Sequence, residues 1–187
     1  FTVVSEQAVD PAEVESVLRA ECVNDGPTVL GVSAVIESLE PGASVVEGAL
    51  RCGLVPGGRR AVTLDTVTIR RSASSPFDPS ALRFLALSWG ADTHVDDGGA
   101  PGGDIIAISH FVDLTNALGR DVGVVALASS TSPATVVLDG AISAPRVPDG
   151  QRLSTRDRFS VRHERAVPID LDVLDFALRL TPARTGD

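Results

Sequence analysis

Residues 174–180 read LDFALRL, and apolar side chains alternate there with polar or small ones. Leu174, Phe176, Leu178 and Leu180 fall on one face of an extended chain, and the residues between them fall on the other. Such alternation is typical of a β-strand that places one face on a core and the other toward solvent. This pattern recurs upstream and decides the fold class.

Segments of similar length precede this strand, and turns rich in Gly and Pro separate them. They lie near residues 30–36, 46–54, 61–71, 82–89, 105–112, 122–128, 135–142 and 159–163. Residues 82–89 are apolar on both faces, which predicts a central strand, and a change of parity near Asp65 predicts a β-bulge. We therefore expect an all-β protein, an antiparallel β-sandwich or single jelly roll of about 8–10 strands.

One segment carries a strong helix signal. Residues 10–13 (DPAE) match a capping box, and apolar side chains follow at helical spacing. We expect one short helix over about residues 11–23, within an N-terminal segment 1–27. A brief helical turn is also expected at residues 113–119. Because no linker or repeat divides the chain, residues 1–187 are expected to form a single domain.

The composition suits a chain that folds around its own core. It has 187 residues, 43% of them hydrophobic, so neither a metal nor a disulfide is needed for a core of this size. Cys22 and Cys52 lie on the apolar side of their local patterns, so buried free thiols are expected, although pairing stays open. The longest apolar run, residues 124–128, is far too short for a membrane-spanning helix, so no transmembrane segment is expected.

The charge pattern bears on partners and source. The net charge is −9, and all 16 basic residues are arginine, which indicates a GC-rich genome or salt adaptation. Direct nucleic-acid binding is not expected, because it requires clustered positive charge. Arginines gather between residues 152 and 165, but Asp157 and Glu164 interrupt them, so this stretch is interpreted as a solvated strand face.

The glycine-rich stretch 90–104 is the best place to look for a site, because long irregular loops often carry function. Its carboxylates and imidazole are candidates for metal ligands: Asp92, His94, Asp96, Asp97 and Asp104. Their spacing matches neither an EF-hand nor a zinc motif, so a solvated loop or a contact arm is the alternative.

Other polar residues are expected to be structural. We interpret His110 and His163 in this way, and we expect Asp170 and Asp172 to face solvent while Ile169 faces the core. No catalytic residue is assigned and no cofactor is expected, so we do not expect an enzyme.

Residues 61–89 and the closing strand at 173–182 are similar in style to shell-domain strands of small icosahedral viruses. The whole pattern resembles that of single jelly-roll virus capsid proteins. Those of RNA viruses generally carry a basic N-terminal arm for the genome. This chain instead has an acidic start with Glu13, Glu15 and Glu21, and Arg19 is its only basic residue before Arg51. It therefore looks more like the major capsid proteins of tailless, membrane-containing dsDNA viruses.

This resemblance implies a structural subunit that forms a virion shell by binding copies of itself and other shell proteins. Two alternatives remain open. The first is a β-sandwich binding or phage-tail-type module of a GC-rich bacterium, which would be cytoplasmic if it is not part of a virion. The second is a small cupin-like metalloenzyme with His94, His110 or His163 in the barrel mouth.

Overall fold

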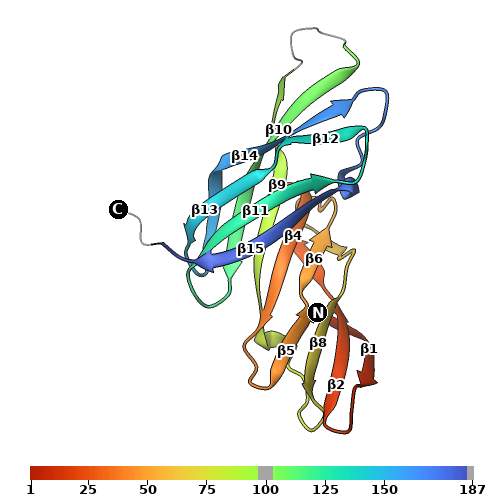
Figure 1. Ribbon diagram of the computed structural model, residues 1–187, viewed down its shortest axis with the longest axis vertical. Helices are drawn as coiled ribbons and strands as arrows, with labels where there is room; N and C mark the ends of the chain where they lie inside the picture. Colours follow the sequence, from red (N-terminus) through yellow and green to blue (C-terminus); the bar gives the residue numbers. More distant parts are fainter. Residues whose placement is uncertain (97–102, 185–187) are drawn as a thin grey trace.

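The computed structural model describes residues 1–96 and 103–184, with side chains described for all of these except 91–96 and 171. This part of the chain is almost wholly β-structure (Figure 1). It contains fifteen strands and two short 3-10 helices, η1 (Pro79–Ala81) and η2 (Leu171–Val173). The strands are β1 (Thr2–Ala8), β2 (Glu13–Arg19), β3 (Glu21–Asn24), β4 (Val29–Ser38), β5 (Ala43–Glu47), β6 (Ala49–Cys52), β7 (Arg59–Val62), β8 (Val67–Ser72), β9 (Leu82–Asp96), β10 (Ile105–Ala117), β11 (Val122–Ser130), β12 (Thr135–Asp139), β13 (Ala141–Val147), β14 (Arg152–Glu164) and β15 (Leu174–Pro182).

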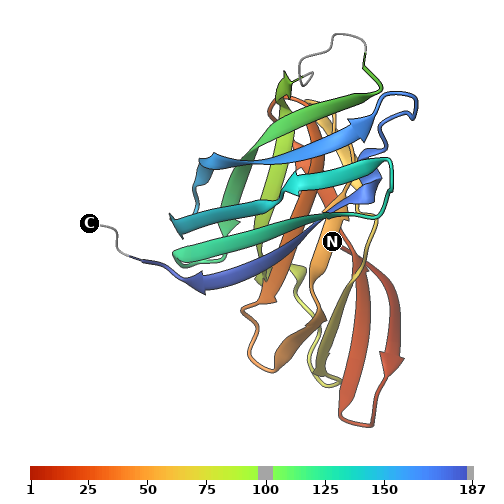
Figure 2. The same ribbon diagram turned by 45° about the horizontal axis from the view of Figure 1, so that its top comes forward.

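Two antiparallel sheets face each other and form a sandwich, which confirms the predicted fold class at that level. The large sheet has the order β12-β14-β10-β9-β4-β6, and the small sheet has the order β13-β11-β15. The predicted central strand is β9, which lies between β10 and β4. Figure 2 shows the strands of the small sheet crossing in front of the large one.

One extended run passes from one sheet to the other at Gly140. Before it, β12 pairs with β14 in the large sheet; after it, β13 pairs with β11 in the small sheet. A Cβ at Gly140 would lie 2.9 Å from the carbonyl oxygen of Ala128, so the close passage of β11 requires glycine here. This run closes one side of the sandwich, whereas β6 and β15 leave the opposite side open.

The sandwich core is centred on Trp89. Its ring lies 5.8 Å from that of Phe159 in the large sheet and 5.0 Å from that of Phe176 in the small sheet. Apolar side chains from both sheets surround these rings, and Trp89 itself is only 3% exposed. The ring lies directly over Gly31 on β4, where an added Cβ would be 2.1 Å from its Cζ2.

A third sheet, with the order β1-β2-β8-β5, packs on the lower ends of β4, β6 and β9 (Figure 1). This lower sheet contributes Leu18 and Ile69 to a second core, in which they meet Ile36, Leu50 and Leu82. Since β4 and β9 contribute to both cores, these two strands join the lower sheet to the sandwich.

The predicted helix at residues 11–23 is wrong, because that segment forms β2 and β3. Asp10 does act as a cap, since its Oδ1 accepts from the backbone N–H groups of Ala12 at 2.7 Å and Glu13 at 2.8 Å. These bonds close a turn between β1 and β2 instead of starting a helix. Pairing with β8 then stabilises the strand, and Arg70 on β8 contacts Glu15 at 2.5 Å.

Two smaller expectations are also corrected. Residues 113–117 continue β10, and only Gly119, at φ +78°, makes the expected turn. The expected bulge near Asp65 is a break between two strands, because β7 pairs with β3 whereas β8 joins the lower sheet.

No helix among the described residues is long and apolar enough to cross a membrane.

The two cysteines are bonded to each other, which corrects the expectation of free thiols. The disulfide Cys22–Cys52 ties β3 to the edge strand β6 across a sequence separation of 30. Closing a loop of that length removes unfolded-state entropy worth about 3–4 kcal/mol in the chain-entropy model. The disulfide thus stabilises the junction between the sandwich and the N-terminal strands.

We expect Gly31→Ala to lower the free energy of unfolding by about 1–3 kcal/mol, because a methyl group would overlap the Trp89 ring. Urea unfolding followed by Trp89 fluorescence measures this loss, since the chain has one tryptophan. Gly90→Ala is the matched control, because its Cβ would meet nothing closer than 3.5 Å. Equal stability of the two variants would contradict this account of the core.

Candidate functional site

The predicted loop at residues 90–104 is in part a strand. Asp92, His94 and Asp96 lie on β9, and the backbone of His94 pairs with Ser109 on β10. Asp97 lies outside the described residues, as do the side chains of these three, whereas Asp104 is exposed just before β10. Among the side chains that the structure describes, no group of three His, Cys, Asp or Glu could hold a metal. The metal site at this loop therefore stays a prediction.

His163 ties the start of β12 to the loop that follows β14. Its Nδ1 lies 2.9 Å from Thr135 Oγ1, and its Nε2 lies 2.8 Å from the carbonyl oxygen of Val167. The side chain is 3% exposed, so both ring nitrogens are occupied by protein groups away from solvent. This arrangement stabilises the end of β14 and leaves no nitrogen for a metal or a substrate.

His110 is part of the sandwich core. Its ring stacks on Phe159 at 4.9 Å and is hydrogen-bonded to the backbone of Gly90. Burial lowers the pKa of His110 below its ordinary value of 6.5, because the surrounding apolar groups disfavour the imidazolium, although the Gly90 hydrogen bond opposes this shift. Its Nδ1 has no hydrogen-bond partner among the described residues.

The paired aspartates before the last strand are exposed, as expected, and they shape a turn. Asp170 Oδ1 accepts from the backbone N–H of Asp172 at 3.0 Å. The expectation that Ile169 faces the core is wrong, because this side chain is 47% exposed. The chain forms η2 here instead of an extended strand, so alternation of side chains does not apply.

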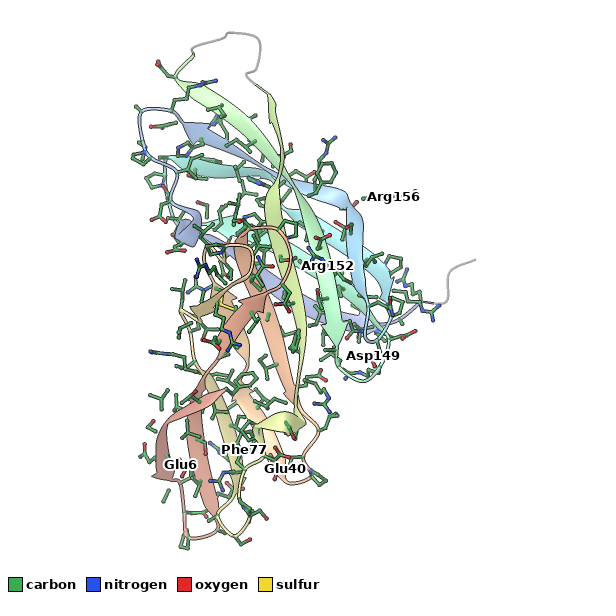
Figure 3. The ribbon with its side chains drawn as sticks, turned by 180° about the vertical axis from the view of Figure 1, so that it is seen from behind. Glu6, Glu40, Phe77, Asp149, Arg152 and Arg156 are labelled. Atoms are coloured by element: carbon green, nitrogen blue, oxygen red, sulfur yellow. A yellow bond between two sulfur atoms is a disulfide. The ribbon has the colours of Figure 1, made fainter. Side chains whose placement is uncertain are left out.

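The arginines of β14 lie on the outer face of the large sheet, where Figure 3 labels Arg152 and Arg156. Arg152 is paired with Asp113 at 2.5 Å, and the guanidinium of Arg158 lies 5.7 Å from the centre of the Phe111 ring. Part of the positive charge of this stretch is therefore held by neighbouring side chains of the same sheet.

An apolar groove of about 420 Å³ opens on this outer face, beside the disulfide. Its floor is made by Ala34 and Ala86, which are register partners on β4 and β9. Phe84, Val23 and the two cysteines of the disulfide also line it. A hollow of this size and lining suits an apolar ligand. Sequence reasoning missed it, although small residues on the outward face of two strands were a visible signal.

The outer face of the small sheet has an apolar centre, bordered by polar side chains such as Ser143 and Arg179, and no described element covers it. Leu127 on β11 is 60% exposed, and its register partners are Ala141 on β13 and Ala177 on β15. Val125, two residues away on the same face, is 44% exposed. These four residues (Val125, Leu127, Ala141 and Ala177) are called the small-sheet patch below.

The class of protein that the structure shows is an antiparallel β-sandwich. No family model and no curated protein matches this chain. Solved structures with some similarity are a β-glucuronidase from glycoside hydrolase family 2, at 9% identity and a TM-score of 0.25, and the YadV chaperone, at 10% identity and a TM-score of 0.20. The matches cover 82% and 88% of this chain, 20% of the glucuronidase and 85% of the chaperone. This chain thus spans about a fifth of the glucuronidase's length, and TM-scores this low support no argument from either.

We expect acid to destabilise the protein through His110. Because its pKa is lower in the folded than in the unfolded state, the unfolded chain binds the proton first, and stability falls as pH drops below about 6.5. The slope is at most about 1.4 kcal/mol per pH unit.

His110→Phe should flatten this slope between pH 7 and pH 5, measured by urea unfolding at each pH. A hydrogen bond from Arg51 lowers the pKa of the Asp65 carboxylate. The stabilisation that such a carboxylate contributes is lost only at lower pH, so it does not affect the slope between pH 7 and pH 5. An unchanged slope in the variant would show that His110 is not the group responsible.

Proposed function

We propose that this protein is a structural subunit that acts by self-association in a large symmetric assembly, of the kind that forms a virus shell. The observation that carries the proposal is the small-sheet patch. Burying the exposed side chains of Val125 and Leu127 against another chain would release favourable free energy, because apolar surface would leave water. A second copy of the chain is always present where the subunit is made, and identical chains commonly assemble with symmetry.

The order of the strands supports the jelly-roll form of this proposal. From β10 to β15, each successive strand lies in the opposite sheet to the one before it. Most successive strands of a jelly roll alternate between its two sheets, and here β12 and β13 do so with a single glycine between them. The strands outside the sandwich, which are β1, β2, β3, β5, β7 and β8, would then be an elaboration on one end of the shell domain.

The disulfide supports a location outside a reducing cytosol. Disulfides persist in oxidising surroundings, and virion surfaces are among these. With a net charge of −9, the subunit would make its contacts with copies of itself and other shell proteins, while genome binding is left to other components.

We expect the wild-type protein to form discrete assemblies in size-exclusion chromatography with light scattering, at low or at multimolar salt. Leu127→Glu should weaken the assembly at least tenfold, because it places a charge in the centre of the small-sheet patch. The mutation should leave the unfolding free energy within about 0.5 kcal/mol, since the side chain is exposed.

Leu39→Glu is the matched control, because Leu39 is equally apolar and 52% exposed but lies after β4, away from the small sheet. Assemblies that survive Leu127→Glu as well as Leu39→Glu would contradict the role of the patch. A wild-type monomer at every salt and protein concentration would overturn the proposed function.

The groove beside the disulfide favours a second candidate, a module that binds an apolar ligand. Ala86→Leu should fill the floor of the groove and weaken binding of the fluorescent probe 1-anilinonaphthalene-8-sulfonate at least fivefold, measured by titration. Ala8→Leu, on the exposed strand β1, is the matched control. Probe binding that is the same in both variants would remove the groove from consideration.

A further inference from the structure

The last strand of the small sheet has a free edge. β15 pairs with β11 along its whole length of nine residues, without a register shift. No described strand pairs with its other edge, because β15 is last in the order β13-β11-β15. In an antiparallel ladder alternate residues direct their N–H and C=O groups to the other side. These groups of β15 are open to a further strand, apart from the N–H of Phe176, which donates to Asp175 Oδ1 at 2.8 Å.

The two sheets differ in width on the same side. The large sheet has six strands and the small sheet has three, so β4 and β6 extend past β15. A cleft of about 740 Å³ lies there, between the inner face of β4 and β6 and the edge of β15. A fourth strand added to the small sheet would occupy this cleft.

The lining of the cleft includes a buried polar group without a hydrogen-bond partner and apolar side chains that are only half-buried. Ser33 on β4 is 3% exposed, and its Oγ has no hydrogen-bond partner among the described residues. Val35 and Leu178, from the two opposing sheets, are apolar and only half-buried at the same place. A buried hydroxyl without a partner is costly, so this region is suited to a group that supplies one.

The charge of the cleft indicates which kind of strand would bind there. Its lining holds three carboxylates, those of Glu47, Asp65 and Asp175, against one guanidinium. That guanidinium, of Arg51, lies 2.8 Å from Asp65 and 4.0 Å from Asp175. The remaining negative charge favours an incoming strand with basic residues.

We infer that the free edge of β15 binds an extended segment of a different protein, with apolar side chains at alternate positions and basic residues at its ends. The segment would add to the small sheet by backbone hydrogen bonding, with its apolar side chains over Val35 and Leu178. The most exposed strand of this chain itself, β1, is a poor donor because it carries Glu6. The inference goes beyond the proposed self-association and does not depend on it.

The test uses a synthetic peptide, RVTVCVTVR, whose valines would face the cleft and whose single cysteine would face outward beside Ala177. In Ala177→Cys the new thiol is the only free one, because Cys22 and Cys52 are paired. Residues opposite each other in neighbouring strands are close enough for a disulfide, so peptide and variant should cross-link under mild oxidation.

Leu127→Cys is the matched control, because Leu127 is the register partner of Ala177 one strand further from the edge. It should not cross-link. Binding of a fluorescent form of the peptide to the wild-type protein, followed by anisotropy, should weaken at least tenfold when the sixth residue of the peptide is proline. It should weaken about fivefold when both arginines are glutamate.

Three outcomes would overturn the inference. The first is equal cross-linking of Ala177→Cys and Leu127→Cys, and the second is equal binding of the proline peptide. The third is an Ala177→Cys protein that forms its own disulfide dimer in preference to the peptide adduct while Leu127→Cys forms none. Both residues belong to the small-sheet patch, so a dimer at Ala177 alone would show that a second copy occupies the edge. Peptide cross-linking confined to Ala177→Cys supports the inference whether or not the protein assembles.

Discussion

The contact between Trp89 and Gly31 is the constraint on which the rest of the structure depends. The indole ring takes the space that a Cβ on β4 would occupy, 2.1 Å from its Cζ2, and this close approach lets one side chain reach both sheets. Phe159 and Phe176 pack against it from opposite sides of the sandwich, and His110 stacks on Phe159 in turn. The same strands, β4 and β9, continue into the second core and hold the lower sheet. The position of this ring therefore sets how the sheets stack.

The two sides of the sandwich differ: one is closed by a continuous run of chain, and the other is open. On one side, Gly140 lets a single run of chain join the two sheets. On the other side, β15 ends the small sheet while the large sheet continues through β4 and β6. An open strand edge and an uncovered sheet face are features that soluble proteins usually protect or use. Self-association through the small-sheet patch and strand addition at β15 are two separate uses of this open side and face.

The alternation of apolar residues was sufficient to predict an all-β sandwich and the closing strand β15, and the apolar side chains on both faces of residues 82–89 predicted the central position of β9. It failed at residues 11–23, where Asp10 forms the hydrogen bonds of a helix cap but pairing with β8 keeps the chain extended. Local signals cannot show a partner that is more than fifty residues away. For the same reason the pairing of Cys22 with Cys52 was left open, and the site residues singled out in 90–104 came from composition alone. The groove floor, Ala34 and Ala86, and the edge of β15 needed the strand order.

By itself, the amino-acid sequence determined that this chain builds β-strands, because side chains that alternate with period two can bury one face only when the chain is extended. It also determined the acidic charge, through 25 carboxylates against 16 arginines. The tertiary structure alone decided which strands are neighbours, which cysteines meet and which edge stays free. Those outcomes depend on contacts between residues far apart in the chain, such as those of Trp89 with Gly31 and Phe176. Such contacts stabilise the protein only after the sheets have come together.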